Sequence, residues 1–300
     1  MSSPARQGII YGVLAYGSWG LIPLYFKLVA EVPPPEVLAE RVVWSFVFLA
    51  AVVTLLGRWP DVRTALAVRR IQLTLCISTL LLSLNWFTFI YAVSTNQVVE
   101  ASLGYFLNPL VNVLLGVVIL KESLRPWQIV SIVLAAVGVA VLGAPLIAVA
   151  LAVSFAFYGL LRKNAAVDGL VGLLIETVLL VPLALAYIAY LESSEGSLFA
   201  AGDWQLRGKL MASGIVTAVP LLLFTAAARR LRYSTLGFLQ YLAPTLQFLL
   251  AVFLFHEELS TAKVVALAFI WTAVVVYAVD SLRSYRQQRR EQLTATPADL

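Results

Sequence analysis

Long apolar runs separated by short polar stretches are the dominant pattern of this 300-residue chain. A bilayer span needs about 20 mostly apolar residues. Inside lipid, backbone N–H and C=O groups must pair within their own segment, so such runs form helices. The pattern predicts ten transmembrane helices, at residues 8–29, 36–56, 72–93, 99–120, 126–143, 145–162, 170–191, 208–228, 235–255 and 261–281.

The sequence of residues 100–141 recurs, in a looser form, at residues 235–276. A constant offset of 135 aligns a proline inside each run, a glutamate at its end and a leucine two residues later. These pairs are Pro109 and Pro244, Glu122 and Glu257, and Leu124 and Leu259. Because internal repeats change the expected fold, the chain is interpreted as two halves of one design.

Five spans per half is an odd number, so the second half should enter the membrane from the opposite face. The predicted units are residues 8–143, residues 145–281 and a basic tail at 282–300. Inverted repeats of this kind recur in secondary transporters, with the site near the bilayer midplane between the halves. The predicted fold class is an all-α polytopic membrane protein with a five-plus-five inverted repeat.

Composition and charge agree with this pattern. Hydrophobic residues make up 61% of the chain and charged residues 12%, with a mean hydropathy of +0.91, whereas a soluble domain has about 25% charged residues. Sixteen of the 21 Lys and Arg residues fall on one predicted side. Since basic residues concentrate in cytoplasmic loops, both termini should be cytoplasmic. The net charge of +5 follows from this asymmetry, and the basic tail fits anionic lipid better than nucleic acid.

Polar side chains form a stripe in the fourth and ninth spans. Tyr105, Asn108 and Asn112 follow each other at i, i+3 and i+7, which places them on one helical face. The ninth span has a matching set, with a tyrosine beside it: Gln240, Tyr241, Pro244 and Gln247. Two readings stay open at this point: the stripes line a shared aqueous cavity, or they form interhelical hydrogen bonds.

Other aromatic and amide residues are further candidates for the wall of this cavity. Trp19-Gly20 in the first span has a counterpart, Tyr158-Gly159, in the sixth. Asn85-Trp86 lies in the third span. The alternatives are packing or an interfacial belt for Trp19, and an interhelical hydrogen bond for Asn85.

Three charged residues inside predicted spans are site candidates, because charge in the bilayer is costly unless it is paired or faces water. Glu40 and Arg41 are neighbours, so on a helix they point about 100° apart and each needs a partner on another helix. Glu176 is the counterpart of Glu40 in the second half. The two acids are candidates for gating or proton relay or for structural pairing, and Arg41 is a candidate contact for an anion.

Four of the prolines inside predicted spans are candidate hinges, because proline weakens or kinks a helix. They are Pro23, Pro109, Pro220 and Pro244. Such sites would let spans bend during a transport cycle.

The chemistry of enzymes and metal sites is missing from the sequence. It contains one histidine, His256, and one cysteine, Cys76. HExxH, GxSxG, paired membrane aspartates and a Walker motif do not occur. These observations predict a non-enzyme with no cofactor and no metal, and any uphill transport would need a gradient, with a proton as a candidate coupling ion.

Several segments resemble a known family. They include RQGIIYGVLAYGSWGLIPLYFKL, PPEVLAERVVWSF, EASLGYFLNPLVNVLLG, SFAFYGLLRK and LIETVLLVP, and they extend in order from about residue 6 to residue 281. The chain is similar to the RarD permeases of the EamA group in the drug/metabolite transporter superfamily. The resemblance implies ten helices, cytoplasmic termini, a central cavity, the bacterial inner membrane and a link to chloramphenicol sensitivity. Where the family suggests a histidine before the arginine, this chain has Glu40, which puts a histidine-based proton role in doubt.

Taken together, these features predict a secondary transporter that moves small organic solutes by alternating access. Amino-acid-like metabolites and amphenicol-type drugs would suit a wall of aromatic and amide groups with few charges. The expected partners are the solute, membrane lipid and a coupling proton, with no nucleic acid. A passive channel, a non-transporting membrane partner and an intramembrane enzyme are the alternatives. The sequence leaves open the natural solute, the direction of transport and whether the protein is a monomer or a homodimer.

Overall fold

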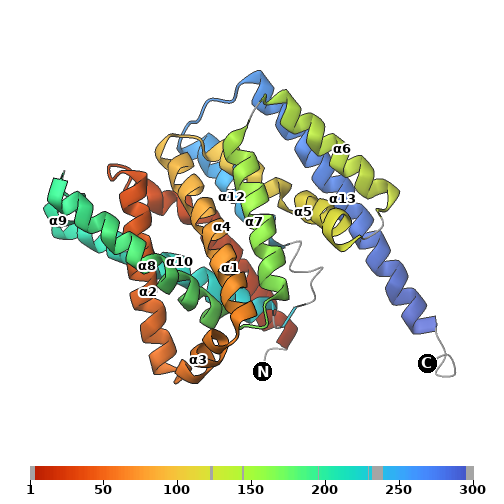
Figure 1. The fold of residues 1–300 in the computed structure, drawn as a ribbon. Coiled ribbons are helices and arrows are strands. Elements are labelled where there is room, and N and C mark those ends of the chain that lie inside the picture. The colour runs from red at the N-terminus through yellow and green to blue at the C-terminus, as the bar shows by residue number, and fades with distance from the viewer. Residues whose placement is uncertain are drawn as a thin grey trace.

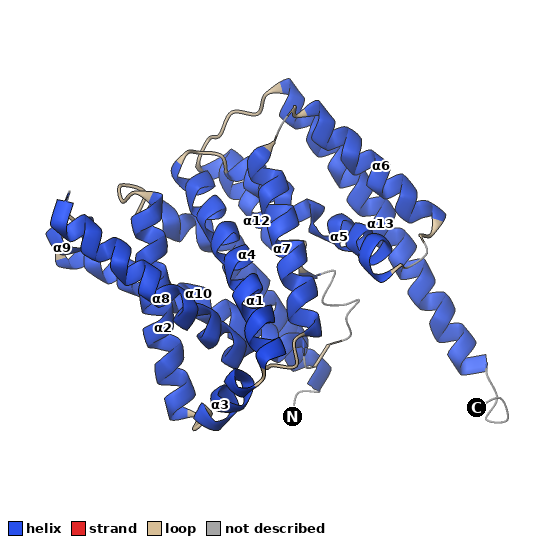
Figure 2. Ribbon diagram, viewed as in Figure 1, coloured by secondary structure: helices blue, strands red, loops and turns tan. Residues whose placement is uncertain are grey.

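The structure is a computed structural model that describes residues 4–121, 124–143, 145–194, 196–228, 230–231 and 239–294. In this part of the chain the regular elements are all helices (Figures 1 and 2). They are α1 (Pro4–Lys27), α2 (Pro34–Leu55), α3 (Trp59–Ala67), α4 (Arg69–Ser94), α5 (Val98–Leu120), α6 (Pro126–Val141), α7 (Leu146–Asn164), α8 (Gly169–Ser194), α9 (Leu198–Ala201), α10 (Trp204–Ala228), α12 (Leu242–Leu249), the π-helical turn η1 (Leu250–Leu254) and α13 (Thr261–Thr294).

Seven of these helices are long and apolar enough to cross a membrane: α1, α2, α4, α5, α8, α10 and α13. The other three predicted runs fall on shorter apolar helices, at Pro126–Val141, Leu146–Arg162 and Leu242–Leu254. The protein is therefore an all-helical polytopic membrane protein. The count of ten crossings stays a prediction.

Local chemistry explains several helix boundaries. The α2 helix begins at Pro34 and α6 at Pro126, where proline suits the first turn because its missing N–H has no intrahelical partner there. Two short helices lie in connections that the hydropathy pattern interprets as loops. Of these, α3 turns Val62 and Ala65 inward and leaves Trp59 and Leu66 exposed.

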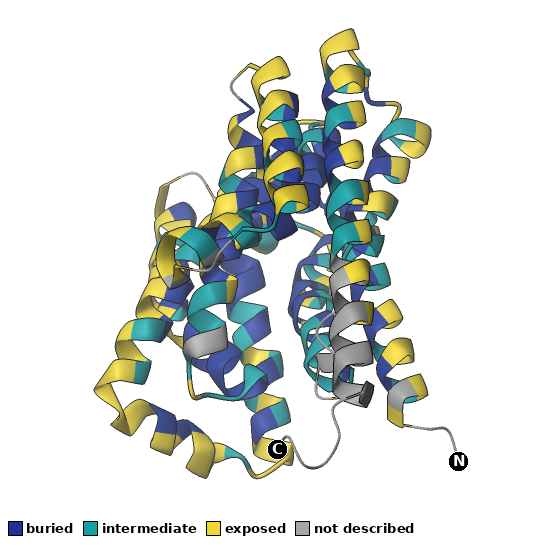
Figure 3. Cartoon of the chain, turned by 90° about the vertical axis from the view of Figure 1, so that its right-hand side faces the viewer, coloured by how far each residue is buried: buried dark blue, intermediate teal, exposed yellow. Residues whose placement is uncertain are grey.

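The two halves of the chain are interleaved. Each of the five apolar helices of the first half packs most extensively against a helix of the second half: α1 against α10, α2 against α8, α4 and α5 against α7, and α6 against α13. The α6–α13 pair lies at one side of the molecule (Figure 1). Figure 3 shows buried residues on the inner faces and exposed residues on the outer faces.

Helix contacts in the two halves correspond to each other. In chain order, α1, α2, α4, α5 and α6 are the apolar helices of the first half, and α7, α8, α10, α12 and α13 are those of the second. Exchanging the halves turns the α1–α10 contact into α7–α4, and α5–α7 into α12–α1, and all four contacts exist. The contacts α2–α8, α5–α12 and α6–α13 each map onto themselves.

A backbone detail follows the same 135-residue offset. Lys121 has φ = 56° and His256 has φ = 52°, directly after α5 and close after η1. This left-handed conformation costs an L-residue roughly 1–2 kcal/mol and suits glycine. Both helices of the repeat therefore end in the same unusual conformation, although neither sequence copy has a glycine there.

Replacing His256 with glycine should stabilise the protein by about 1 kcal/mol. Its exposed side chain contributes little packing, and glycine removes the left-handed penalty. The expected result is a higher melting temperature of the purified protein in detergent, and Lys121→Gly should act in the same direction. Unchanged or lower melting temperatures for both variants would contradict the shared conformation.

Candidate functional site

Arg41 of α2 is buried at the interface between the halves, with an exposed fraction of 5%. Its Nε donates a hydrogen bond of 2.7 Å to Oγ1 of Thr217 on α10. Its guanidinium lies 4.2 Å from the ring centroid of Trp86 on α4 and 5.4 Å from that of Phe26 on α1. These four residues are the Arg41 cluster. Sequence reasoning predicted Arg41 and Trp86 but missed Phe26 and Thr217, whose residue types are common throughout apolar helices.

Asn85, beside Trp86 on α4, connects three helices. Its Nδ2 donates to the carbonyl oxygen of Leu151 at 3.2 Å and to Oγ of Ser154 at 3.0 Å, both on α7. The Tyr105 hydroxyl of α5 donates to Asn85 Oδ1 at 3.2 Å. Asn85 therefore forms the interhelical hydrogen bonds that the sequence left as its alternative role.

Glu176 of α8 lies in a second buried polar group, fully shielded from solvent. Its carboxylate accepts hydrogen bonds from Ser78 Oγ of α4 at 2.5 Å and from the Tyr158 hydroxyl of α7 at 3.4 Å. Arg162 Nε of α7 lies 3.9 Å from Glu176 Oε1. These four residues are the Glu176 cluster. Arg162 was missed as a site residue although it lies four residues after Tyr158, on the same helical face.

A row of aromatic rings connects the two clusters. Ring centroids are separated by 6.0 Å from Phe26 to Phe89, 5.9 Å from Phe89 to Tyr105, 6.1 Å from Tyr105 to Phe155 and 6.1 Å from Phe155 to Tyr158. The row begins at the cation–π partner of Arg41 and ends at a hydrogen-bond donor to Glu176. It forms an apolar path between one buried cation and one buried acid.

Glu40 is also buried, but its hydrogen-bond donor lies on its own helix. Nε1 of Trp44, one turn later on α2, donates to Glu40 Oε2 at 2.9 Å. The sequence predicted a partner on another helix for both residues. This is confirmed for Arg41, which bonds Thr217, and is wrong for the hydrogen bond of Glu40, whose donor is on α2 itself. A tryptophan at i+4 can satisfy a carboxylate locally because i and i+4 lie on one face.

The predicted polar stripes divide between different surroundings. Gln247 is buried and donates to the Trp19 backbone carbonyl at 3.1 Å, which joins α12 to α1. Tyr241 stacks on Phe106 of α5, with centroids 6.4 Å apart. The remaining three differ in burial: Asn108 is buried, Gln240 half-buried and Asn112 exposed.

The four predicted prolines all lie within helices, Pro23 in α1, Pro109 in α5, Pro220 in α10 and Pro244 in α12. Pro244 belongs to the first turn of α12, where a missing N–H costs little. The π-helical turn η1 follows α12 directly. The hinge role predicted for these prolines remains a prediction.

Charged groups near the ends of the helices join the halves as well. Glu257 accepts hydrogen bonds from the N–H groups of Val98 at 2.7 Å and Val99 at 2.9 Å, so it caps the start of α5 from the other half. Its predicted counterpart, Glu122, lies outside the described residues. Glu36 of α2 accepts from Ser197 Oγ at 2.9 Å.

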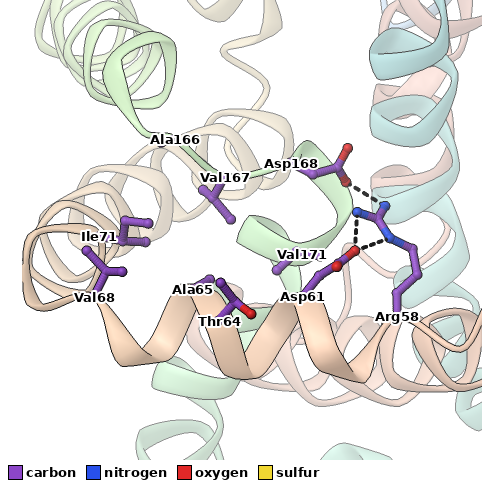
Figure 4. A pocket seen from close by; sticks show the side chains of 10 residues that line it. All are labelled: Arg58, Asp61, Thr64, Ala65, Val68, Ile71, Ala166, Val167, Asp168 and Val171. Atoms are coloured by element: carbon purple, nitrogen blue, oxygen red, sulfur yellow. Dashed lines mark hydrogen bonds and ion pairs between the residues drawn. The ribbon is translucent and has the colours of Figure 1, made fainter.

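A cavity of about 500 Å³ lies between α3 and the connection from α7 to α8 (Figure 4). Among its lining residues, Arg58 forms ion pairs with Asp61 of α3, at 2.7 Å, and with Asp168, at 3.0 Å. The hydrogen bond to Asp61, and then the pairing with Asp168, raise the pKa of the Arg58 guanidinium above its usual range. These charges satisfy each other, so the cavity differs from the Arg41 cluster, where the cation has no acid beside it among the described residues.

Comparison with known proteins gives consistent results. The profile of the EamA-like transporter family matches residues 6–144. Protein RarD of Escherichia coli is 45% identical, over 95% of this chain and 97% of that protein. An uncharacterized transporter of Vibrio cholerae is 44% identical, over 95% of this chain and 96% of that protein. The chloramphenicol-sensitive protein RarD of Pseudomonas aeruginosa is 31% identical, over 95% and 97%.

A solved structure, titled "Crystal structure of protein", shares the fold. Its TM-score is 0.61 at 23% identity, covering 91% of this chain and 97% of that chain. The near-complete coverage of relatives above 40% identity establishes a membrane transporter. The chain therefore belongs to the EamA-like transporter family, as a RarD-type permease.

Proposed function

We propose that this protein is a secondary transporter of the bacterial inner membrane that moves small organic solutes by alternating access between its halves. The observation that carries the proposal is the buried polar seam where the halves meet. Arg41 of the first half contacts Thr217 of the second, and Ser78 of the first contacts Glu176 of the second. Polar groups inside a membrane bundle are costly and mark solute or ion pathways.

The contacts at the helix ends support the predicted ten-crossing topology, with both termini in the cytoplasm. Arg58 pairs with Asp168, and Arg125 with Asp280 at 2.8 Å, all on the predicted inner side. Glu257 with Val98, and Glu36 with Ser197, lie on the predicted outer side. In each case, alternating crossings would place both partners on the same side of the membrane.

Two further observations support an inverted repeat of residues 8–143 and 145–281, followed by a cytoplasmic tail at 282–300. The helix contacts of one half correspond to those of the other when the halves are exchanged, and Lys121 and His256 share one rare backbone conformation. The family profile covers residues 6–144, about one predicted repeat. In this scheme the ion pair of Arg58 with Asp168 closes the inner side, and Glu40 and Glu176 are the candidate sites for a coupling proton.

Solute classes to test first are amino-acid-like metabolites and amphenicols. The latter are suggested by the printed name of the Pseudomonas relative. A thermal-shift screen of the purified protein should find a stabilising compound from one of these classes. That compound, radiolabelled, should then enter proteoliposomes in a saturable manner and show counterflow.

The matched variants are Asn108→Leu and Gln240→Leu, in the two predicted stripes, with Thr272→Leu at an exposed position of α13 as the control. A carrier with its pathway at the seam should lose most of its counterflow in the first two and keep it in the third. Flux that neither saturates nor shows counterflow would indicate a channel. Unchanged flux in both Asn108→Leu and Gln240→Leu would place the pathway elsewhere.

A further inference from the structure

The Arg41 guanidinium has donors that the protein does not use. Arginine carries five N–H donors and keeps its charge in proteins. Nε is bound to Thr217, and the two aromatic rings of Trp86 and Phe26 lie over the guanidinium. In the part of the chain that the structure describes, its two terminal nitrogens have neither a hydrogen bond nor an ion pair.

The buried carboxylates of the described residues do not accept hydrogen bonds from the terminal nitrogens of Arg41. The four buried glutamates among the described residues already accept hydrogen bonds elsewhere: Glu36 from Ser197 and Phe199, Glu40 from Trp44, Glu176 from Ser78 and Tyr158, and Glu257 from Val98 and Val99. A buried charge without a counterion is strongly unfavourable. An anion from outside the chain would remove this cost.

We propose that Arg41 binds the carboxylate of the transported solute, so that the natural solutes are small organic acids with an apolar side group. This rests on the transport function proposed above. The two rings and the bond to Thr217 hold the guanidinium in place and leave the edge with its two terminal nitrogens for a ligand. A planar carboxylate matches this edge because it can accept two parallel hydrogen bonds from it. To the row of rings from Phe26 to Tyr158, which begins beside the guanidinium, we assign contact with the apolar side group of the solute.

The test compares two probes of nearly equal shape, N-acetylphenylalanine and its neutral amide, on purified full-length protein in detergent. The carboxylate should stabilise the protein and the amide should not. Arg41→Lys keeps the charge but loses the two-pronged geometry, and should weaken binding of the carboxylate about 10- to 100-fold. Equal stabilisation by both probes, or carboxylate binding unaffected by Arg41→Lys, would overturn the proposal.

A second variant tests whether Arg41 instead stabilises the fold. Arg41→Met removes an uncompensated buried charge, so without probe it should melt at or above the temperature of the wild type. A clear loss of stability would instead assign Arg41 a structural role and overturn the proposal. Stabilisation by sodium chloride equal to that by the carboxylate would also overturn it, because the site would then take inorganic anions.

Failure of the solute class and failure of transport give different results. Saturable counterflow of neutral chloramphenicol, with no binding of the carboxylate probe, would reject the acid specificity and leave the transporter standing. Absence of saturable flux for every compound that binds would reject the transport function itself. Counterflow of N-acetylphenylalanine that is lost in Arg41→Lys and kept in Arg207→Lys would support both, since Arg207 is a half-buried arginine that bonds the backbone carbonyls of Phe199 and Ala200 near a helix end.

Discussion

Replacing Gly214 with alanine is expected to destabilise the protein by about 3 kcal/mol, at the upper end of the usual cost of overpacking. Gly214 lies on α10 where that helix crosses α2, and an added Cβ would overlap the backbone carbonyl of Trp44. Backbone atoms cannot move aside as a flexible side chain can. The helices would have to separate, and this crossing holds the two halves together.

Gly208 provides the matched control because it lies on the same helix with nothing within 4 Å of its added Cβ. Gly208→Ala should be neutral or stabilising, since alanine is the better helix former by about 1 kcal/mol. The measurement is the monodisperse yield and melting temperature of both variants in detergent. Similar behaviour of the two variants would show that the close crossing of α2 and α10 is absent.

Replacing Glu176 with leucine is also expected to have a large effect, lowering the free energy of unfolding by about 3 kcal/mol. The change leaves Arg162 without its acidic partner, and breaking a buried ion pair from one side costs about 3–5 kcal/mol. The lower value is expected because the two groups are 3.9 Å apart and Arg162 keeps a side-chain exposure of 13%. Ser78 and Tyr158 also lose their acceptor.

The double variant Arg162→Leu with Glu176→Leu separates the interaction energy of the two side chains from the other effects of each substitution. Removing both charges should recover part of the lost stability, so the two single costs should not add. Glu192→Leu, an exposed position on the same helix, should be close to neutral. Additive costs in the Arg162–Glu176 cycle would mean that the two side chains do not interact.

Much of the fold could be predicted because lipid leaves the backbone few choices. Runs such as 170–191 and 208–228 lie within α8 and α10, since an apolar segment of that length must satisfy its own hydrogen bonds. The helix α3 was missed because its nine residues include Asp61, Arg63 and Thr64 and lie in a connection, which hydropathy interprets as a loop. The inverted repeat remains a prediction that the exchange of helix contacts supports.

The candidate site was predicted less completely. Arg41 and Glu176 stood out because charge inside an apolar run is rare, and both proved to be buried in polar clusters. Asn112 lies one turn after the buried Asn108 yet is exposed, a difference in packing that the residue type does not reveal. Arg162 appeared to be one more basic residue of a helix end, and only its position opposite Glu176 reveals its role.

Hydropathy alone determined that this chain is a helical membrane protein, and the 135-residue offset predicted two related halves. The tertiary structure decided which helices meet, that α2 crosses α10 at Gly214, and that Arg41 contacts Trp86 and Thr217. The physical reason is that lipid is as apolar as a leucine side chain. An apolar face therefore looks the same in the sequence whether it contacts acyl chains or another helix, and only the packed structure separates the two.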